Sequence, residues 1–553
     1  MRKIIYKQYL LAILWVFILY IPTIYALSSS IISDRYFSGS IVNIHDHNAY
    51  LSSVQDGMNG EVWLGNLLFT TESDLPQGLH HIHASLFYRI LGWIYGLIGL
   101  PINLFYIVIG SIFAFIAFIG YCKLFNACFS SKRELTVAMI LLFVFPGVLW
   151  INQLMQQIPD NTTYFPNHIL FAELWGNPSM NPLTHNSYMP HFVFATATSS
   201  ILFCSLLEVV HSKSSNYLRI AISSLLVAWL LPTLGILWIA ISFTYILYNR
   251  LYFGLSNSRI KLLSISFVPA VILSLWSSHL VFLDEFWVKY IYTNVVMNGT
   301  IDLALFILHL GIFSIVVAWS MFEIAKNHTK NSGGTVLAVI WFFWLFIISL
   351  ASFPGSPRFM DGIYLPVIIL VTYAYSNIRN TKPALLRWFN LTIIVAVLPG
   401  TILTYIYPWY GHLYVHFSET RLNLLSDEIW PIHLSKSEAN TLYWLKDNVD
   451  NSDVVISGPI MSSFVPAFSG SRVYFGHIGR TVDFHRKLDE LQTLEDTKRL
   501  PLLELDGDLW LVSTPKEPIA SPSRLYVGQT NYYCATDSIL MDDVSVVQYQ
   551  WCD

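Results

Sequence analysis

Charge is scarce in this sequence. Only 12% of its 553 residues are Asp, Glu, Lys or Arg, whereas soluble domains average about 25%. Hydrophobic residues make up 54% of the chain. This deficit excludes an ordinary soluble protein. Long apolar runs recur from Leu10 to Tyr407, which indicates that a lipid bilayer is the solvent for most of the chain.

Several other features are missing. The net charge of −4 gives no case for a nucleic-acid partner. The five cysteines form no CxxC pair, and the polar tail contains neither a GxGxxG motif nor a phosphate-binding loop. Cys534 and Cys552 lie in that tail and could form one disulfide if the tail is extracytoplasmic. A reduced pair is equally compatible with the sequence.

Eleven apolar runs are candidate membrane spans, because about 20 apolar residues cross a bilayer. The first run lacks the short apolar core of a signal peptide, which predicts a retained helix that starts in the cytoplasm. The two runs beside Pro232 are short and could be two crossings or one broken element. The spans are Leu10–Ala26, Asn103–Tyr121, Leu135–Ile151, Phe192–Val210, Leu218–Leu231, Thr233–Leu247, Leu262–Leu280, Leu303–Phe322, Val336–Ser352, Ile363–Tyr375 and Phe389–Tyr407.

Loop charges predict the orientation of these spans. Every loop after an even-numbered span is basic, and the loops on the opposite side are poor in Lys and Arg. This alternation holds only if Pro232 separates two crossings. It predicts a multi-pass plasma (inner) membrane protein with a cytoplasmic N-terminus. Residues 1–407 would form the transmembrane domain, with residues 27–102 as its first outer loop, and residues 408–553 an extracytoplasmic domain.

The tail changes composition abruptly and predicts a small α/β domain. Ser435–Val449 has the pattern of a capped amphipathic helix, and Thr481–Leu500 is charged and helical. Asp453–Gly458 and Asp508–Pro515 are typical of short strands. In the first outer loop, Leu86–Leu100 is too short for a crossing and predicts an interfacial helix. The fold class is therefore mainly α: a polytopic helical membrane protein with a small α/β domain.

The stretch Ile44–Trp63 is the best candidate for a reactive loop. It holds an acid, Asp46, between His45 and His47, and at helical spacing Asp46 shares one face with Tyr50, Ser53 and Gly57. Asp46 could simply cap this helix. The two roles are compatible, because a carboxylate at a helix start stays ionised and an ionised carboxylate can act as a general base.

The outer loops also carry histidines and a few cations. His45, His47, His81 and His83 suit substrate hydrogen bonding or polar interfacial structure, and no known zinc spacing is matched. We therefore predict no cofactor, with a divalent metal as the lesser alternative. Among the cations, Arg358 lies between Pro and Gly residues on the predicted outer side and is a candidate to bind a phosphate.

Two further outer cations, Arg89 and Lys289, are more simply interpreted as reaching lipid headgroups. Lys289 is nevertheless kept as a candidate substrate-binding residue beside Tyr50 and Arg358. Asp34 is interpreted as a solvated charge near the membrane surface.

The first loop carries a spaced set of residues, namely Asp46, Tyr50, Gly57, Met58, Gly60 and Trp63. This set resembles the first loop of the GT-C superfamily of membrane glycosyltransferases. Its pattern is similar to the protein O-mannosyltransferase and lipid A aminoarabinose transferase branch, with His81–Leu86 in the place of that branch's second motif. The tail stretches Ala439–Ser457, Val465–His477 and Leu509–Glu517 resemble the outer tails of bacterial members.

The resemblance implies transfer of a sugar from a polyprenyl-phosphate carrier to a hydroxyl of a glycan, lipid or protein acceptor on the outer membrane face. Asp46 would be the catalytic base and Arg358 a cation for the carrier phosphate. The chain departs from the pattern in two places: His47 follows the acid where relatives carry a second acid, and the Pro-Pro of the second motif is absent. A transporter or flippase of lipid-linked glycans, or a non-catalytic scaffold, are the alternatives.

Overall fold

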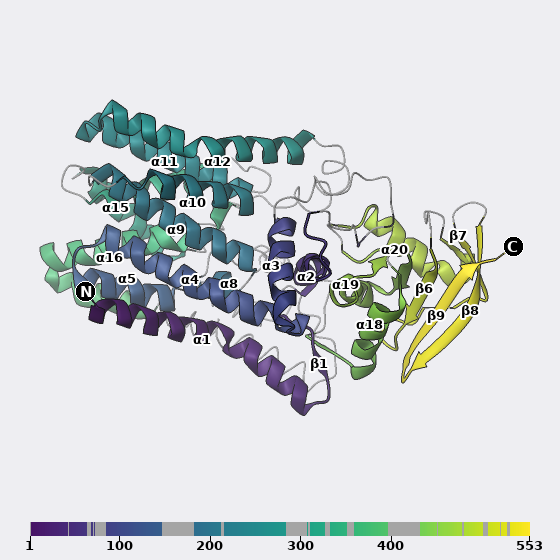
Figure 1. Ribbon diagram of the computed structural model, residues 1–553. Helices are drawn as coiled ribbons and strands as arrows, with labels where there is room; N and C mark the ends of the chain where they lie inside the picture. The colour runs from purple at the N-terminus through teal and green to yellow at the C-terminus, as the bar shows by residue number, and fades with distance from the viewer. Residues whose placement is uncertain are drawn as a thin grey trace. The chain divides into compact units, whose positions relative to one another are not determined.

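The structure is a computed structural model, in which the chain forms two compact units (Figure 1). Unit 1 comprises Met1–Pro22, Val108–Ser278 and Asn298–Ile429; unit 2 comprises Thr23–Ile107, His279–Met297 and Trp430–Asp553. The structure describes residues 2–41, 44–63, 68–69, 71, 84–145, 182–187, 189–211, 215–283, 307, 310–326, 332–350, 359–395, 397, 432–450, 452–477, 480–500, 507–519, 521–527 and 531–552.

Helices dominate unit 1 because its apolar runs must satisfy every backbone hydrogen bond internally. In its core the rings of Phe203, Trp238 and Trp341 contact one another, with the two indole rings edge to face at 4.6 Å. The helices are α1 (Arg2–Ile32), α4 (Phe105–Cys128), α5 (Lys132–Val144), α8 (Pro182–Ser187), α9 (Pro190–His211), α10 (Tyr217–Leu230), α11 (Pro232–Phe253), α12 (Asn257–Leu283), α14 (Ile312–Lys326), α15 (Gly333–Leu350) and α16 (Tyr364–Thr381). Parts of α1, α4 and α12 belong to unit 2.

A described helix overlaps each of the eleven predicted spans. Within the described residues, five helices are long and apolar enough to cross a membrane: Lys7–Ile32, Ile102–Cys128, Pro190–His211, Pro232–Phe253 and Asn257–Ser277. Pro232 is the first residue of α11, where its missing N–H costs nothing. It therefore separates α10 from α11, two helices that pack against each other. The predicted polytopic helical class is confirmed.

After the end of α1, unit 2 continues with a short strand and two closely packed helices. Strand β1 (Tyr36–Phe37) pairs antiparallel with β2 (His433–Leu434) and so ties the start of the unit to its tail. Helices α2 (Ile44–Met58) and α3 (Ala84–Ile98) pack through glycines: a Cβ on Gly57 would lie 2.0 Å from the Arg89 carbonyl oxygen, and one on Gly92 2.2 Å from that of Val54. Only glycine permits this approach.

A seven-stranded mixed sheet forms the rest of unit 2, in the order β4-β3-β6-β9-β8-β7-β5. Its predicted strands at 453–458 and 508–515 appear as β3 and β6, which pair in parallel. The disulfide between Cys534 and Cys552 joins β8 to the residue after β9. The strands are β3 (Val454–Ser457), β4 (Arg472–Val473), β5 (Arg499–Leu500), β6 (Leu509–Ser513), β7 (Arg524–Val527), β8 (Asn531–Met541) and β9 (Val544–Trp551).

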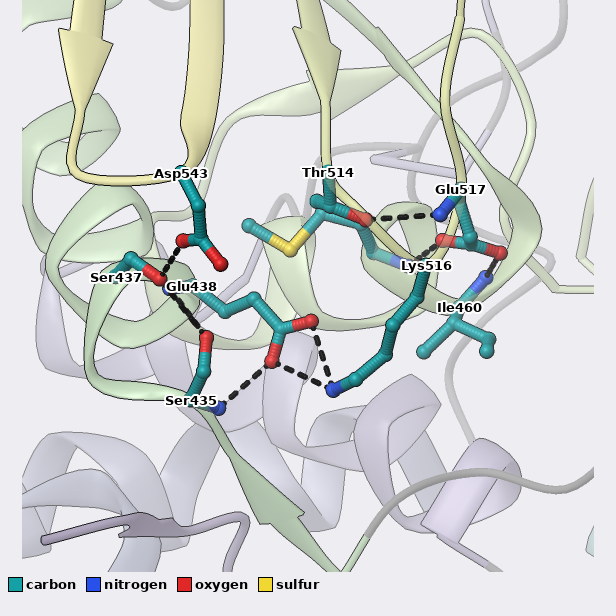
Figure 2. Close-up of polar contacts among 9 residues, drawn as sticks. Ser435, Ser437, Glu438, Ile460, Thr514, Lys516, Glu517 and Asp543 are labelled. Carbon is teal, nitrogen blue, oxygen red and sulfur yellow. Dashed lines mark hydrogen bonds and ion pairs between the residues drawn. The ribbon is translucent and has the colours of Figure 1, made fainter. Parts of the chain in front are cut away.

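Glutamate carboxylates accept hydrogen bonds at the start of two helices of unit 2 (Figure 2). Ser435 caps α18 (Lys436–Asn448) through a reciprocal capping box with Glu438, as the sequence predicts. Lys516 Nζ donates to Glu438 at 3.0 Å. The Glu517 carboxylate accepts from the N–H groups of Ile460 and Met461, and so fills the start of α19 (Pro459–Phe468). That helix start, often an anion site in α/β folds, is thus occupied by the chain itself.

Candidate functional site

Asp46 is the third residue of α2, inside its first turn. It is therefore not the residue that precedes and caps the helix. Its carboxylate still lies at the positive end of the helix dipole, which favours the ionised form. The side chain keeps 35% of its surface exposed, whereas twelve other residues of the same helix are buried. Asp46 is thus an acid that solvent or a substrate can reach.

The tail supplies the partner of this acid. His477 Nε2 lies 3.1 Å from Asp46 Oδ1, and the histidine side chain is only 8% exposed. Burial lowers the pKa of His477, against the opposing effect of its bond to Asp46. Because an ionised carboxylate can only accept, Nε2 of the neutral ring must carry the proton. The sequence alone predicted no role for His477, although this histidine ends one of the tail stretches that carry the resemblance.

A compact loop after β4 holds His477 in place. The N–H groups of Gly476 and His477 both donate to Thr481 Oγ1, at 3.1 and 3.2 Å. Thr481 Oγ1 in turn donates to the Phe69 carbonyl at 2.8 Å. A Cβ on Gly476 would lie 2.5 Å from the Ser462 carbonyl oxygen. The loop therefore needs glycine immediately before the histidine to bring it against the first loop.

The two histidines beside Asp46 are buried. The His45 ring stacks on the His477 ring, with centroids 4.0 Å apart and planes 4° from parallel. The His47 ring packs against Tyr106, whose hydroxyl donates to the His47 carbonyl at 2.7 Å. Burial lowers the pKa of His45 to about 2 and that of His47 to about 3. Both rings are neutral at physiological pH, and their substrate-binding roles stay predictions.

Arg480 brings a cation to the site. Its guanidinium lies 5.1 Å from the centre of the Tyr50 ring, one turn along α2 from Asp46. Burial lowers the pKa of Arg480, while Tyr50 and Asp46 favour its charged form. Arg480 lies three residues beyond His477, so the same loop delivers both. Nothing in its sequence context distinguished Arg480 from a surface arginine.

Arg89 is a second, buried arginine of the same unit. Its side chain is 1% exposed, so the interpretation that it reaches lipid headgroups is wrong. Burial lowers its pKa; Asp56 of α2 opposes this shift and Arg480 adds to it. Its Nε and Nη1 atoms have no hydrogen-bond partner among the described residues. Two guanidinium groups therefore act electrostatically on the same part of α2.

Several predicted site residues lie outside the described part of the chain, namely His81, His83, Lys289 and Arg358. Their roles stay predictions. Within the described residues no group of three or more His, Cys, Asp and Glu side chains is placed to hold a metal ion. Asp34 is described, and its exposed carboxylate pairs with Lys436, which is also exposed, at 3.3 Å. Such a surface ion pair has little energetic consequence.

Unit 1 contains a separate cluster of buried polar groups. Tyr364 and Tyr121 share a hydrogen bond between their hydroxyls at 2.8 Å, Tyr121 donates to Asn186 Oδ1 at 2.9 Å, and Asn186 Nδ2 donates to Tyr364 at 3.2 Å. His185 Nε2 lies 2.8 Å from Thr196 Oγ1. Tyr121, Asn186 and Tyr364 thus form a closed ring of hydrogen bonds, and all three residues are fully buried.

No protein-family model and no curated protein sequence matches this chain. Solved structures do match. The arabinofuranosyltransferase AftD from Mycobacteria gives a TM-score of 0.54 at 13% identity, over 99% of this chain and 41% of that one. The chain has the GT-C fold. The predicted resemblance is confirmed at the level of the fold, and an identity this low extends it no further.

Two other solved structures are similar with TM-scores below 0.5. ArnT from Cupriavidus metallidurans, solved with undecaprenyl phosphate, gives 0.49 at 12% identity, over 99% of this chain and 98% of that one. The oligosaccharyltransferase of Archaeoglobus fulgidus gives 0.48 at 13% identity, over 83% of this chain and 62% of its own length. The present chain thus spans less than two thirds of the oligosaccharyltransferase and less than half of AftD.

Proposed function

We propose that this chain is a membrane glycosyltransferase that moves a sugar from a polyprenyl-phosphate carrier to an acceptor hydroxyl at the outer face of the membrane. One observation carries the proposal: in a chain with the GT-C fold, the Asp46 carboxylate is held at a helix start, is one-third exposed, and has the Arg480 charge near it. An accessible, ionised and oriented carboxylate is what a general base requires.

The proposed reaction is an inverting displacement. The acceptor hydroxyl loses its proton to Asp46, and its oxygen forms a bond to the anomeric carbon of the sugar. The bond between that carbon and the carrier phosphate oxygen breaks, and the electron pair leaves with the phosphate. Cations that meet this developing charge stabilise the transition state. Arg480 is the described candidate, and Arg358 and Lys289 keep their predicted roles beside it.

The membrane setting supports the same proposal. The apolar helices of unit 1 offer surfaces suited to a prenyl chain, and the basic loops favour an outer position for the loop of Asp46. The disulfide between Cys534 and Cys552 favours an extracytoplasmic tail, because such bonds persist in oxidising compartments. The sugar, the acceptor class and the use of His81 and His83 in binding them belong to the proposal.

Two alternatives are less well supported. A non-catalytic scaffold would be favoured by a covered Asp46, but a third of its side chain is exposed. A transporter would be favoured by ionisable groups on broken helices within the membrane. In unit 1, Tyr121, Asn186 and Tyr364 instead form a closed ring of hydrogen bonds.

The test is incubation of the purified protein with a panel of prenyl-phosphate sugars and acceptors, followed by mass spectrometry of the products. We expect one donor to be consumed and its sugar to appear on an acceptor hydroxyl. Asp46→Asn should lower turnover by at least about 100-fold, the usual contribution of a general base, with thermal unfolding unchanged. Asp34→Asn, which alters an exposed carboxylate, is the matched control and should keep full turnover.

Full turnover by Asp46→Asn would overturn the assignment of the base. Uptake of lipid-linked glycan into vesicles without turnover would favour the transporter. Binding of a prenyl-phosphate sugar without either activity would favour the scaffold.

A further inference from the structure

His477 and Asp46 are 431 residues apart in the sequence and are joined by a hydrogen bond of 3.1 Å. We propose that His477 is a positioning residue for the reaction: it holds one oxygen of the Asp46 carboxylate so that the other is presented to the acceptor hydroxyl. The proposal rests on the function proposed above and assigns the C-terminal region a direct part in building the reactive site.

The geometry requires His477 to be the donor. The carboxylate accepts through Oδ1 and has no proton to give when ionised. A bond to one oxygen restricts rotation of the carboxylate about its Cβ–Cγ axis. General-base catalysis depends on that orientation, since the base must lie within hydrogen-bond reach of the proton that it removes.

Two other rings pack against the His477 ring. His45 stacks on it in parallel at 4.0 Å, and the Phe69 ring meets it at 64° with centroids 5.8 Å apart. The backbone of His477 is bound to Thr481. A histidine that merely tied two segments together would need none of this ring packing, because a hydrogen bond alone suffices for a tie.

The arrangement also gives His45 a role. Its ring is 5% exposed and lies flat on His477, so it supports the positioning residue from the helix that carries Asp46. The sequence H-D-H thus places a support for the tail's histidine directly before the acid. A flat apolar ring at position 45 would serve the same purpose, whereas a small side chain would leave the His477 ring free to turn.

The experiment uses the full-length protein, with the donor and acceptor found in the panel above. His477→Phe keeps a flat ring stacked on His45 but removes the N–H group that donates the hydrogen bond to Asp46. We expect its kcat to fall by about 100-fold, the order expected when a reacting group is misplaced. The KM of this variant for the prenyl-phosphate sugar should stay within about twofold of the wild-type value, because His477 contacts the base and not the carrier. His477→Gln, which keeps an N–H donor, should recover part of the loss.

A second pair of variants tests whether the stacked His45 ring holds His477 in place. His45→Ala should lower kcat, and His45→Phe should keep most of it. The exposed His485 provides the control, and His485→Phe should behave as the wild type in both constants. Thermal unfolding of each variant in detergent separates a lost orientation from a lost fold.

The outcomes are distinguishable. A wild type that transfers no sugar would overturn the proposed function and this proposal with it. A wild type that is active while His477→Phe retains the same kcat would overturn this proposal alone. A kcat that falls only in proportion to lost folded protein, with no recovery in His477→Gln and no difference between His45→Ala and His45→Phe, would reduce His477 to a structural tie.

Discussion

The two units treat buried polar groups in opposite ways. In unit 1, Tyr121, Asn186 and Tyr364 close a ring of hydrogen bonds with no exposed surface. In unit 2, His45 and His477 are also buried, yet their contacts lead to Asp46, whose side chain is one-third exposed. A closed ring can only stabilise. Buried rings such as those of His45 and His477, which contact an accessible acid, can also orient that acid for a reaction.

The same distinction applies within unit 2. The carboxylate of Glu517 accepts from the N–H groups of Ile460 and Met461 and fills the start of α19 (Figure 2). Asp46 also lies at a helix start, but its contact with His477 leaves it partly exposed. The two carboxylates at helix starts therefore differ in exposure: Glu517 is bonded to the helix N–H groups, whereas Asp46 remains partly exposed.

The largest effect expected at the open cluster of unit 2 is produced by acid. The pKa values of His45 and His47 fall from 6.5 to about 2 and about 3 on folding. Below about pH 6.5 the unfolded state binds protons that the folded state does not, so stability is fully present above that pH and is lost as the pH falls. Each histidine can contribute up to about 1.4 kcal/mol per pH unit.

Hydrogen exchange of the α2 amides measures this loss locally. Protection should fall between about pH 6.5 and about pH 4.5 once the intrinsic exchange rate is allowed for. His47→Asn, which cannot titrate, should show a shallower dependence than the wild type. Equal slopes in the two proteins, or constant protection, would contradict a buried neutral His47.

The next effect concerns the helix pair that presents the acid. In Gly57→Ala the added Cβ would lie 2.0 Å from the backbone oxygen of Arg89, so α3 must move. Overpacking of this kind costs about 1–3 kcal/mol, which exceeds the gain of about 1 kcal/mol in helix propensity. The unfolding temperature and the rate of sugar transfer should both decrease.

Gly96→Ala is the control for this contact. Its Cβ would lie 3.3 Å from the Cα of Met58 in the same helix pair, so a small shift of one helix relieves it. If the two variants unfold at the same temperature, close packing at Gly57 is not what holds α2 and α3 together.

Much of the fold was accessible from sequence because it rests on local patterns. Apolar runs indicated the helices of unit 1, and the capping box at Ser435 and the strand at 453–458 followed from composition and spacing. The same local patterns indicated Asp46. The hairpin of β8 and β9 was missed, although Val544, Val546 and Tyr549 of β9 are buried apolar residues.

The residues that contact Asp46 could not be predicted from local sequence patterns. His477 and Arg480 lie more than four hundred residues away, and no periodicity connects them to α2. Their placement depends on a loop that Gly476 and Thr481 bend against Phe69. The exposure of Arg89 was predicted wrongly for a related reason: whether this arginine is buried depends on how closely α2 and α3 pack, which a single sequence does not reveal.

The smallest effect belongs to the closed ring of unit 1. Tyr364→Phe removes a hydroxyl that bonds with Tyr121 and accepts from Asn186. Tyr121 can still donate to Asn186, and Asn186 still donates to the Pro182 carbonyl at 2.6 Å. Since most of the network survives, the loss should be about 0.5–1.5 kcal/mol of stability. Thermal unfolding in detergent should register it while kcat stays within about twofold of the wild type. A kcat that fell more than about tenfold at an unchanged unfolding temperature would place chemistry in unit 1 and remove the contrast between a closed cluster that stabilises and an open one that reacts.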